Sequence, residues 1–188
     1  MDSKANIYRS LRRELPFLPA VMAWRAAQSQ IDLHKRIRET GFAWEGNFSI
    51  EQKAAWEEQG FTLTARVVSD DLGWYEEGVE CIGQFQDQWV PGAIEHDRLN
   101  PRILTWFVPA FPENGKTLYR RACSYGDDWS YVGIEVSAHR AGIELGTDSV
   151  WGIESDTGDD YLTQVAFDLA DEAIVTANKS LKDLCGCN

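Results

Sequence analysis

The fold of this chain is decided at Trp151-Gly-Ile-Glu-Ser-Asp-Thr-Gly-Asp-Asp-Tyr-Leu162, where an apolar, strand-like run turns into an amphipathic helix. Glycine, Asp and Thr residues clustered between two such patterns mark the turn itself. Thr157, followed three residues later by Asp160, predicts a helix N-cap with an acidic partner. Because acidic side chains stabilise a helix N-terminus, the helix explains most of the acid in this stretch.

The residues on either side of this turn predict a hairpin and a covering helix. Residues 129–138 form a strand with Val132, Ile134 and Val136 on one face, and residues 139–142 form a turn. Residues 143–154 return as a long strand, with a bulge near residues 146–148. The closing helix, from about residue 158 to residue 184, lays an apolar stripe on this sheet that consists of Leu162, Val165, Ala166, Leu169, Ala173 and Ala177.

The remaining pattern completes an α+β fold, an antiparallel sheet with a long hairpin covered by a C-terminal helix. We expect strands at residues 42–48, 61–68 and 103–108 and a helix at residues 115–125. Ser49 and Gln52 predict a capping box for a further helix that ends near Gln59, before Gly60. Residues 69–102 show no clear pattern and are expected to hold strand fragments in long loops.

The first 41 residues predict a pair of helices separated by Pro16 and Pro19. The apolar face of the first helix consists of Ile7, Leu11 and Leu15. The inward stripe of the second consists of Met22, Ala26, Leu33 and Ile37, and Gly41 ends this helix. We expect one domain over residues 1–188, with a helical N-terminal segment at 1–41 and a sheet-and-helix body at 42–188.

Charge is distributed unevenly along the chain. The net charge is −12, and residues 1–40 carry eight basic and four acidic side chains, a net of +4, so the remaining 148 residues carry −16. A strongly acidic body repels phosphate backbones, and general nucleic-acid binding is therefore not expected. The acidic side chains form either an ordinary solvated surface or a surface that binds a basic partner.

Cysteine usage favours a reducing compartment. Cys81, Cys123, Cys185 and Cys187 are too sparse for a disulfide scaffold, and neither a signal peptide nor an apolar run of membrane-spanning length is evident. We therefore expect a cytoplasmic protein that does not bind a membrane. A structural zinc site needs about four ligands, and the histidines are scattered, so neither a metal nor a cofactor is expected. The role of the pair Cys185 and Cys187 stays open.

Two groups of residues were weighed for catalysis. The carboxylates Glu135, Glu144, Glu154 and Asp156 could share a divalent cation or a proton if neighbouring strands project them together. Against this, Glu135 and Glu144 alternate out of phase with the apolar residues, as on a solvated strand face. Glu95-His96-Asp97 is a poor triad because adjacent strand residues point in opposite directions. No phosphate-binding loop or nucleophile elbow occurs, so no catalytic residue is assigned and no enzyme is expected.

The C-terminal half resembles a known group of proteins. The order Trp106-Phe-Val-Pro109, Asp128-Trp-Ser-Tyr-Val-Gly-Ile134, Val150-Trp-Gly-Ile-Glu-Ser-Asp156 and Gly158-Asp-Asp-Tyr-Leu162 is similar to a family of small accessory proteins encoded by bacteriophages and integrative mobile elements. The resemblance covers roughly residues 103–180. It implies a setting, the cytoplasm of a bacterial host, and no reaction or catalytic residue.

Together these observations predict a non-catalytic accessory protein that binds a bacterial host protein through a basic surface of that protein. An inhibitor of a defence system such as CRISPR-Cas would be one such protein. Eight Trp, eight Phe and six Tyr fit either an interface or a Trp-rich core. Three alternatives stay open: a metal-dependent hydrolase or nuclease that uses the carboxylates, a structural or DNA-packaging accessory protein, and a homodimer. The candidate binding residues are Glu154, Asp156, Asp159, Asp160, Trp74 and Trp89.

Overall fold

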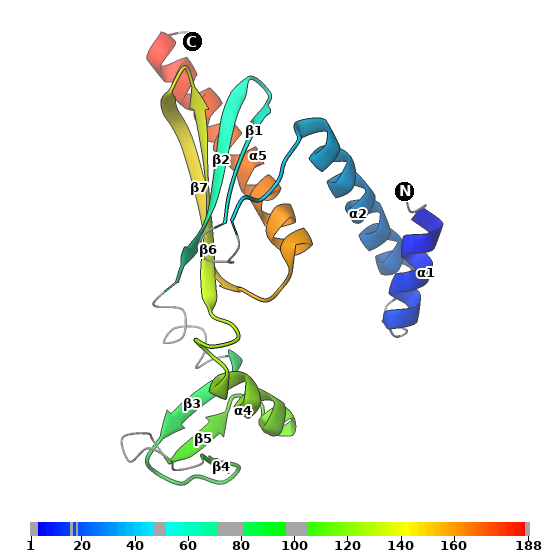
Figure 1. Ribbon diagram of the computed structural model, residues 1–188, viewed down its shortest axis with the longest axis vertical. Helices are drawn as coiled ribbons and strands as arrows, with labels where there is room; N and C mark the ends of the chain where they lie inside the picture. Colours follow the sequence, from blue (N-terminus) through cyan, green and yellow to red (C-terminus); the bar gives the residue numbers. More distant parts are fainter. Residues whose placement is uncertain are drawn as a thin grey trace.

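The computed structural model describes residues 4–15, 17, 19–46, 52–70, 81–96 and 105–186. It confirms the α+β class, and Figure 1 shows three parts. A larger antiparallel sheet with the C-terminal helix along it lies at one end of the long axis, and a smaller sheet with a short helix lies at the other. A pair of N-terminal helices stands beside the larger sheet.

The larger sheet has the order β1-β2-β6-β7, and every neighbouring pair is antiparallel. Its strands are β1 (Lys53–Glu58), β2 (Phe61–Ser69), β6 (Tyr131–Arg140) and β7 (Ile143–Glu154). The predicted hairpin is β6–β7, closed by Ala141 and Gly142, both at positive φ, as a two-residue hairpin turn requires. One register shift falls at Leu145, just before the predicted bulge, and a second places Trp151 and Gly152 opposite Gly133.

Helix α5 (Asp159–Cys185) packs along β6 and β7 and buries the predicted stripe. Val165 is partly buried, whereas the other five predicted residues are buried, and the stripe is widened by Phe167, Ala170 and Ile174. Gly146 permits the close approach, because a Cβ there would overlap the backbone of Ala173 and Ala177. The rings of Phe42, Trp56 and Phe167 meet with centroids 4.9 to 5.7 Å apart, which extends this core to β1.

The smaller sheet has the order β3-β5-β4 and forms a second buried cluster. Its elements are β3 (Gly83–Gln86), β4 (Ile94–Glu95) and β5 (Trp106–Pro109), followed by the short 3-10 helix η3 (Pro112–Asn114) and helix α4 (Gly115–Cys123). Helix α4 matches the predicted helix at 115–125. The strand predicted at 103–108 begins at Trp106, and residues 103 and 104 lie outside the described ranges. The single-domain interpretation stays a prediction.

The helix expected between Ser49 and Gln59 is wrong, because β1 occupies this part of the chain. Ala54 and Trp56 are buried while their neighbours along the strand are exposed, which is the period of a half-buried strand. Gln59 and Gly60 both have positive φ and form a hairpin turn between β1 and β2 rather than a helix end. Ser49 lies outside the described residues.

Three smaller expectations also need correction. Of the strand predicted at 42–48, residues 42–46 show a single bridge, between Glu45 and Lys53, and residues 47 and 48 lie outside the described ranges. The N-cap of α5 is Gly158 rather than Thr157, and no side chain caps the helix. The helices α1 (Lys4–Glu14) and α2 (Ala20–Thr40) are confirmed, and Gly41 ends α2, but Met22 is 55% exposed because the buried stripe begins one residue later, at Ala23.

The packing of α5 yields a stability prediction. Leu169 is 8% exposed and faces the core. Leu169→Asp should lower the free energy of unfolding by about 3 to 5 kcal/mol, since it places a charge among the apolar side chains of the core. Val175→Asp, on the exposed side of the same helix, is the matched control and should have a much smaller effect. Urea unfolding of both variants measures this, and equal stability of Leu169→Asp and wild type would refute the packing of α5.

Candidate interaction surface

A continuous acidic segment forms one edge of the larger sheet and most of its covering helix. Residues 141–178, from the β6–β7 turn through β7 into α5, contain nine acidic residues and no Lys or Arg. We call this segment the acidic tract. Its acidic residues are Glu144, Asp148, Glu154, Asp156, Asp159, Asp160, Asp168, Asp171 and Glu172.

Helix geometry explains why the acids of α5 face water. The helix buries one face against β6 and β7, so Asp168, Asp171 and Glu172 fall on the opposite face and are exposed. Large apolar and aromatic side chains are also exposed in the acidic tract, on β7 as well as on α5. Along the acidic tract they are Ile143, Val150, Trp151, Tyr161 and Val175.

Trp151 is an exposed aromatic residue whose position is set by the backbone around it. Its ring lies over Gly133, where a Cβ would overlap it. Gly133 lies between two core residues of β6, so the ring lies on the sheet face opposite α5. Gly152 has a φ of 75°, and its N–H donates to Oδ2 of Asp70 at 3.0 Å, which fixes the bulge. Trp151 remains 46% exposed.

Arg121 of α4 binds the turn between β7 and α5. Its guanidinium donates to Oε2 of Glu154 at 2.8 Å and to both carboxylate oxygens of Asp156 at 2.5 and 2.7 Å. The same guanidinium stacks 3.7 Å from the ring centre of Trp129, whose Nε1 donates to the Arg121 carbonyl oxygen. This contact joins the smaller sheet to the larger one.

The ion pair between Arg121 and Asp156 shifts the pKa of both groups. The hydrogen bond from Arg121 lowers the pKa of Asp156, and the same bond raises the pKa of Arg121. Asp156 is therefore held by a partner 35 positions away in the sequence, rather than explained by the helix N-terminus as the sequence predicted. Asp159 and Asp160 do lie in the first turn of α5, as expected.

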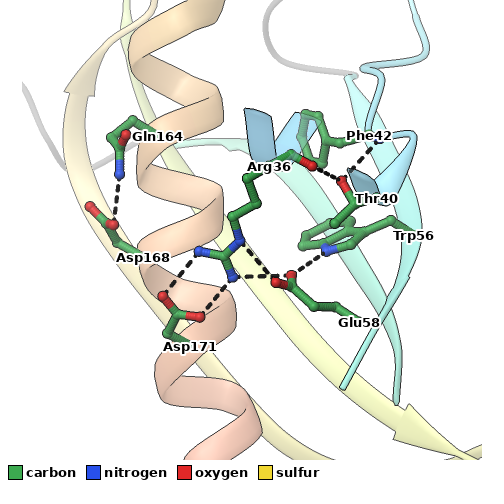
Figure 2. A network of polar contacts seen from close by, with 8 residues as sticks. All are labelled: Arg36, Thr40, Phe42, Trp56, Glu58, Gln164, Asp168 and Asp171. Carbon is green, nitrogen blue, oxygen red and sulfur yellow. Dashed lines mark hydrogen bonds and ion pairs between the residues drawn. The ribbon is translucent and has the colours of Figure 1, made fainter. Parts of the chain in front are cut away.

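Arg36 of α2 fastens the N-terminal helices to the acidic tract, as Figure 2 shows. Its guanidinium donates to both oxygens of Glu58 at 3.0 Å and to both oxygens of Asp171 at 3.0 and 2.7 Å. Trp56 Nε1 donates to the same Glu58 at 3.1 Å. Burial lowers the pKa of Arg36, but the hydrogen bonds to Asp171 and Glu58 outweigh burial and raise it.

The four carboxylates weighed for catalysis do not form one group, although two of them, Glu154 and Asp156, meet on Arg121. Glu135 pairs with Arg66 at 2.5 Å, whereas Glu154 and Asp156 pair with Arg121, and Glu144 is exposed near the β6–β7 turn. Within the described ranges, no three His, Cys, Asp or Glu side chains are grouped so that they could hold a metal ion.

His96 lies beside aromatic residues rather than in a triad. Its Nδ1 is 2.9 Å from the Tyr119 hydroxyl and 3.9 Å from Cys123 Sγ, and its ring packs edge-on against Phe85. Asp97 lies outside the described residues, so the poor triad geometry inferred for Glu95-His96-Asp97 from the sequence stays a prediction.

Of the two tryptophans predicted as binding residues, the structure describes one. Trp89 is 60% exposed in the loop after β3, and Trp74 lies outside the described residues. Sequence reasoning missed Trp151 as a surface residue. The adjacent Gly152 could have indicated it, because a glycine inside a strand often marks a bulge, and a bulge changes the direction of a neighbouring side chain.

Comparison with protein-family models, with curated proteins and with solved structures finds no match. Among the helices of the described ranges, none has both the length and the apolar character needed to cross a membrane.

The Arg121 ion pair predicts a pH-dependent contribution to stability. Because the pKa of folded Asp156 is lowered, its contribution is present above the unfolded-state value, near 3.8, and is lost as the pH falls through the folded-state value. Asp156→Asn should lower the free energy of unfolding at pH 7 by about 0.2 to 1 kcal/mol, as expected for a partly exposed pair. This difference from wild type should shrink below pH 3.8.

Urea unfolding at a series of pH values measures this effect. Asp127→Asn, at an exposed position next to the Tyr125–Trp129 bridge, is the matched control. A difference between Asp156→Asn and wild type that stays constant from pH 7 to below pH 3.8 would show that the ion pair does not stabilise the fold.

Proposed function

We propose that the protein is a non-catalytic accessory protein of a bacteriophage or mobile element, which acts by binding a basic surface of a bacterial host protein. The acidic tract carries this proposal, because it combines nine acids, no Lys or Arg, and exposed aromatic residues on one strand and one helix. The bacterial setting rests on the resemblance of the C-terminal half to proteins of such elements.

Most of the acid in the tract is available to a partner. Arg121 pairs with Glu154 and Asp156, and Arg36 pairs with Asp171. In the described part of the chain, no Lys or Arg pairs with the other six acids, although His34 Nε2 lies 4.0 Å from Asp160. Uncompensated surface charge steers an oppositely charged partner, while like-charged surfaces repel. The partner should therefore present Lys and Arg.

The exposed aromatic residues supply binding energy, which surface charge alone does not. Trp and Tyr are enriched among residues that contribute most to binding, and charged rim contacts mainly affect association rate and specificity. Trp151 is already held in one orientation by Gly133 and Gly152, so it loses little conformational freedom on binding. We therefore assign two apolar anchors: Trp151 on the sheet face opposite α5, and Tyr161 on α5 next to Asp159 and Asp160, with the acids of the tract as the electrostatic contact.

A basic channel that normally holds nucleic acid is a suitable partner surface. A defence effector such as CRISPR-Cas has such a channel, and an acidic protein that occupies it would act as an inhibitor in the cytoplasm of the host. The metal-dependent hydrolase or nuclease remains the alternative, but no specific observation favours it, because Arg66 binds Glu135 whereas Arg121 binds Glu154 and Asp156.

Affinity purification from the bacterial host, followed by mass spectrometry, tests the proposed function. Tagged wild type should recover a stoichiometric basic partner. Trp151→Ala, and the double variant Asp168→Lys with Glu172→Lys, should each recover at least about tenfold less, since each removes an anchor or reverses the steering charge. The double variant Glu113→Lys with Asp127→Lys, at exposed positions outside the tract, is the matched control.

Two results would overturn this proposal. The first is recovery of the same partner by the tract variants and by wild type in equal amounts. The second is turnover of a nucleotide or nucleic acid by the pure protein that stops when EDTA removes divalent ions, which would favour the hydrolase.

A further inference from the structure

The α1–α2 hairpin, residues 4–40, has an incomplete core. Helix α1 packs against α2, where Ala23 and Ala27 are fully buried. The C-terminal half of α2 contacts the body through Leu33, Ile37 and Arg36. Figure 1 accordingly shows α1 on the far side of α2 from the larger sheet. A helix pair with a single mutual interface leaves its other faces to solvent.

Apolar side chains lie on those open faces. Phe17 is 81% exposed, and Val21, Met22 and Trp24 are each about half exposed or more. Trp24 is only partly open, because its ring packs edge-on against Tyr8 of α1 at 5.7 Å between centroids and lies under Lys4 Nζ at 4.2 Å. Phe17, Val21 and Met22 therefore leave large apolar side chains exposed at and just before the start of α2, and exposed apolar patches mark interaction sites.

The charge of the hairpin is opposite to that of the acidic tract. Residues 1–40 carry a net charge of +4, and the exposed basic residues include Arg9, Arg13 and Arg25. The first twenty residues of α5 carry five acids and no Lys or Arg, and Tyr161 and Val175 are exposed among them. The two surfaces thus have opposite charge, and both expose apolar side chains.

The same complementarity already operates within one chain. Arg36 of α2 holds Asp171 of α5, and His34 of α2 lies near Asp160. Toward the N-terminus of α2, a groove of about 400 Å³ lies between α2 and α5. Its lining includes Arg25, Gln28 and Phe167. The N-terminal part of the hairpin therefore does not cover the tract of its own chain.

Other occupants fit this patch less well. A four-helix bundle of two hairpins would bring together two surfaces of the same positive charge. A nucleic acid would bring its phosphates close to a body that carries −16. The acidic tract of a second copy matches both the charge and the apolar character of the hairpin.

We propose that two copies of this chain associate by exchanging hairpins, so that the α1–α2 hairpin of each lies on the α5 part of the acidic tract of the other. Such a contact is made twice around a two-fold axis, which closes the assembly as a dimer. It covers part of the surface that the proposed function assigns to a host protein, so the dimer and the host complex compete. The dimer itself does not depend on the host partner.

Sedimentation velocity of the full chain tests the dimer. Wild type should show a concentration-dependent dimer, and its dissociation constant should rise at least about tenfold when salt increases from about 50 to about 500 mM. The hairpin variant Arg9→Glu, Arg13→Glu and Arg25→Glu should be monomeric. The α5 variant Asp168→Lys and Glu172→Lys should also be monomeric. Lys116→Glu, at an exposed position of α4, is the matched control and should dimerise like wild type.

Mixing the two variants gives the decisive readout. The hairpin variant and the α5 variant have complementary charges at both contacts, so an equimolar mixture should form a heterodimer although neither variant associates alone. Circular dichroism checks that both remain folded. Wild type that stays monomeric at low salt, a mixture that stays monomeric, or a dimer that survives the α5 substitutions would overturn the proposal. The last result would instead indicate a hairpin-to-hairpin bundle.

Discussion

The packing of α5 along β6 and β7 is the contact on which the rest of the molecule depends. Gly146 lets the backbone of Ala173 and Ala177 approach the strand directly, and Phe167 carries the same core across to Phe42 and Trp56. With one face of the helix fixed, its acids have only the solvent side to occupy. The surface charge of the protein is therefore a consequence of how its core is packed.

Two arginines connect the outlying parts of the chain to this unit. Arg36 ties the N-terminal hairpin to β1 and α5, and Arg121 ties α4 to the end of β7. Both guanidiniums also stack on a buried aromatic ring, Phe167 and Trp129 respectively, which limits the freedom of the long side chains. Residues of the acidic tract thus hold other parts of the chain in place, and most of its remaining acids face solvent.

Local periodicity was enough to predict the hairpin and the closing helix. Val132, Ile134 and Val136 alternate cleanly, and α5 keeps a helical apolar stripe over many turns. The same reasoning failed at residues 53–58, because Lys-Ala-Ala-Trp-Glu-Glu is rich in good helix formers and is followed by Gly60, which resembles a helix end. Its strand state is imposed by pairing with β2 and by burial of Trp56, which no local signal reports.

In the candidate site, too, the sequence predicts the local features and not the long-range contacts. Asp159 and Asp160 were placed correctly at the helix N-terminus, since their role is local. The pairing of Asp156 with Arg121 and of Asp171 with Arg36 joins residues 35 and 135 positions apart, and spacing along the sequence carries no information about such contacts. The exposure of Trp151 depends on a bulge opposite Gly133, which needs the register of β6 and β7.

The central claim is that the acidic tract is the surface that contacts a host partner, and carboxyl footprinting tests it most directly. The protein is labelled at its Asp and Glu side chains with a carbodiimide and an amine, alone and in its complex from host lysate, and then mapped by mass spectrometry. We expect protection of Asp159, Asp168 and Glu172 in the complex, with Glu113 and Asp127 labelled equally in both states. Equal labelling of the tract with and without the partner, or protection confined to residues outside it, would contradict the claim.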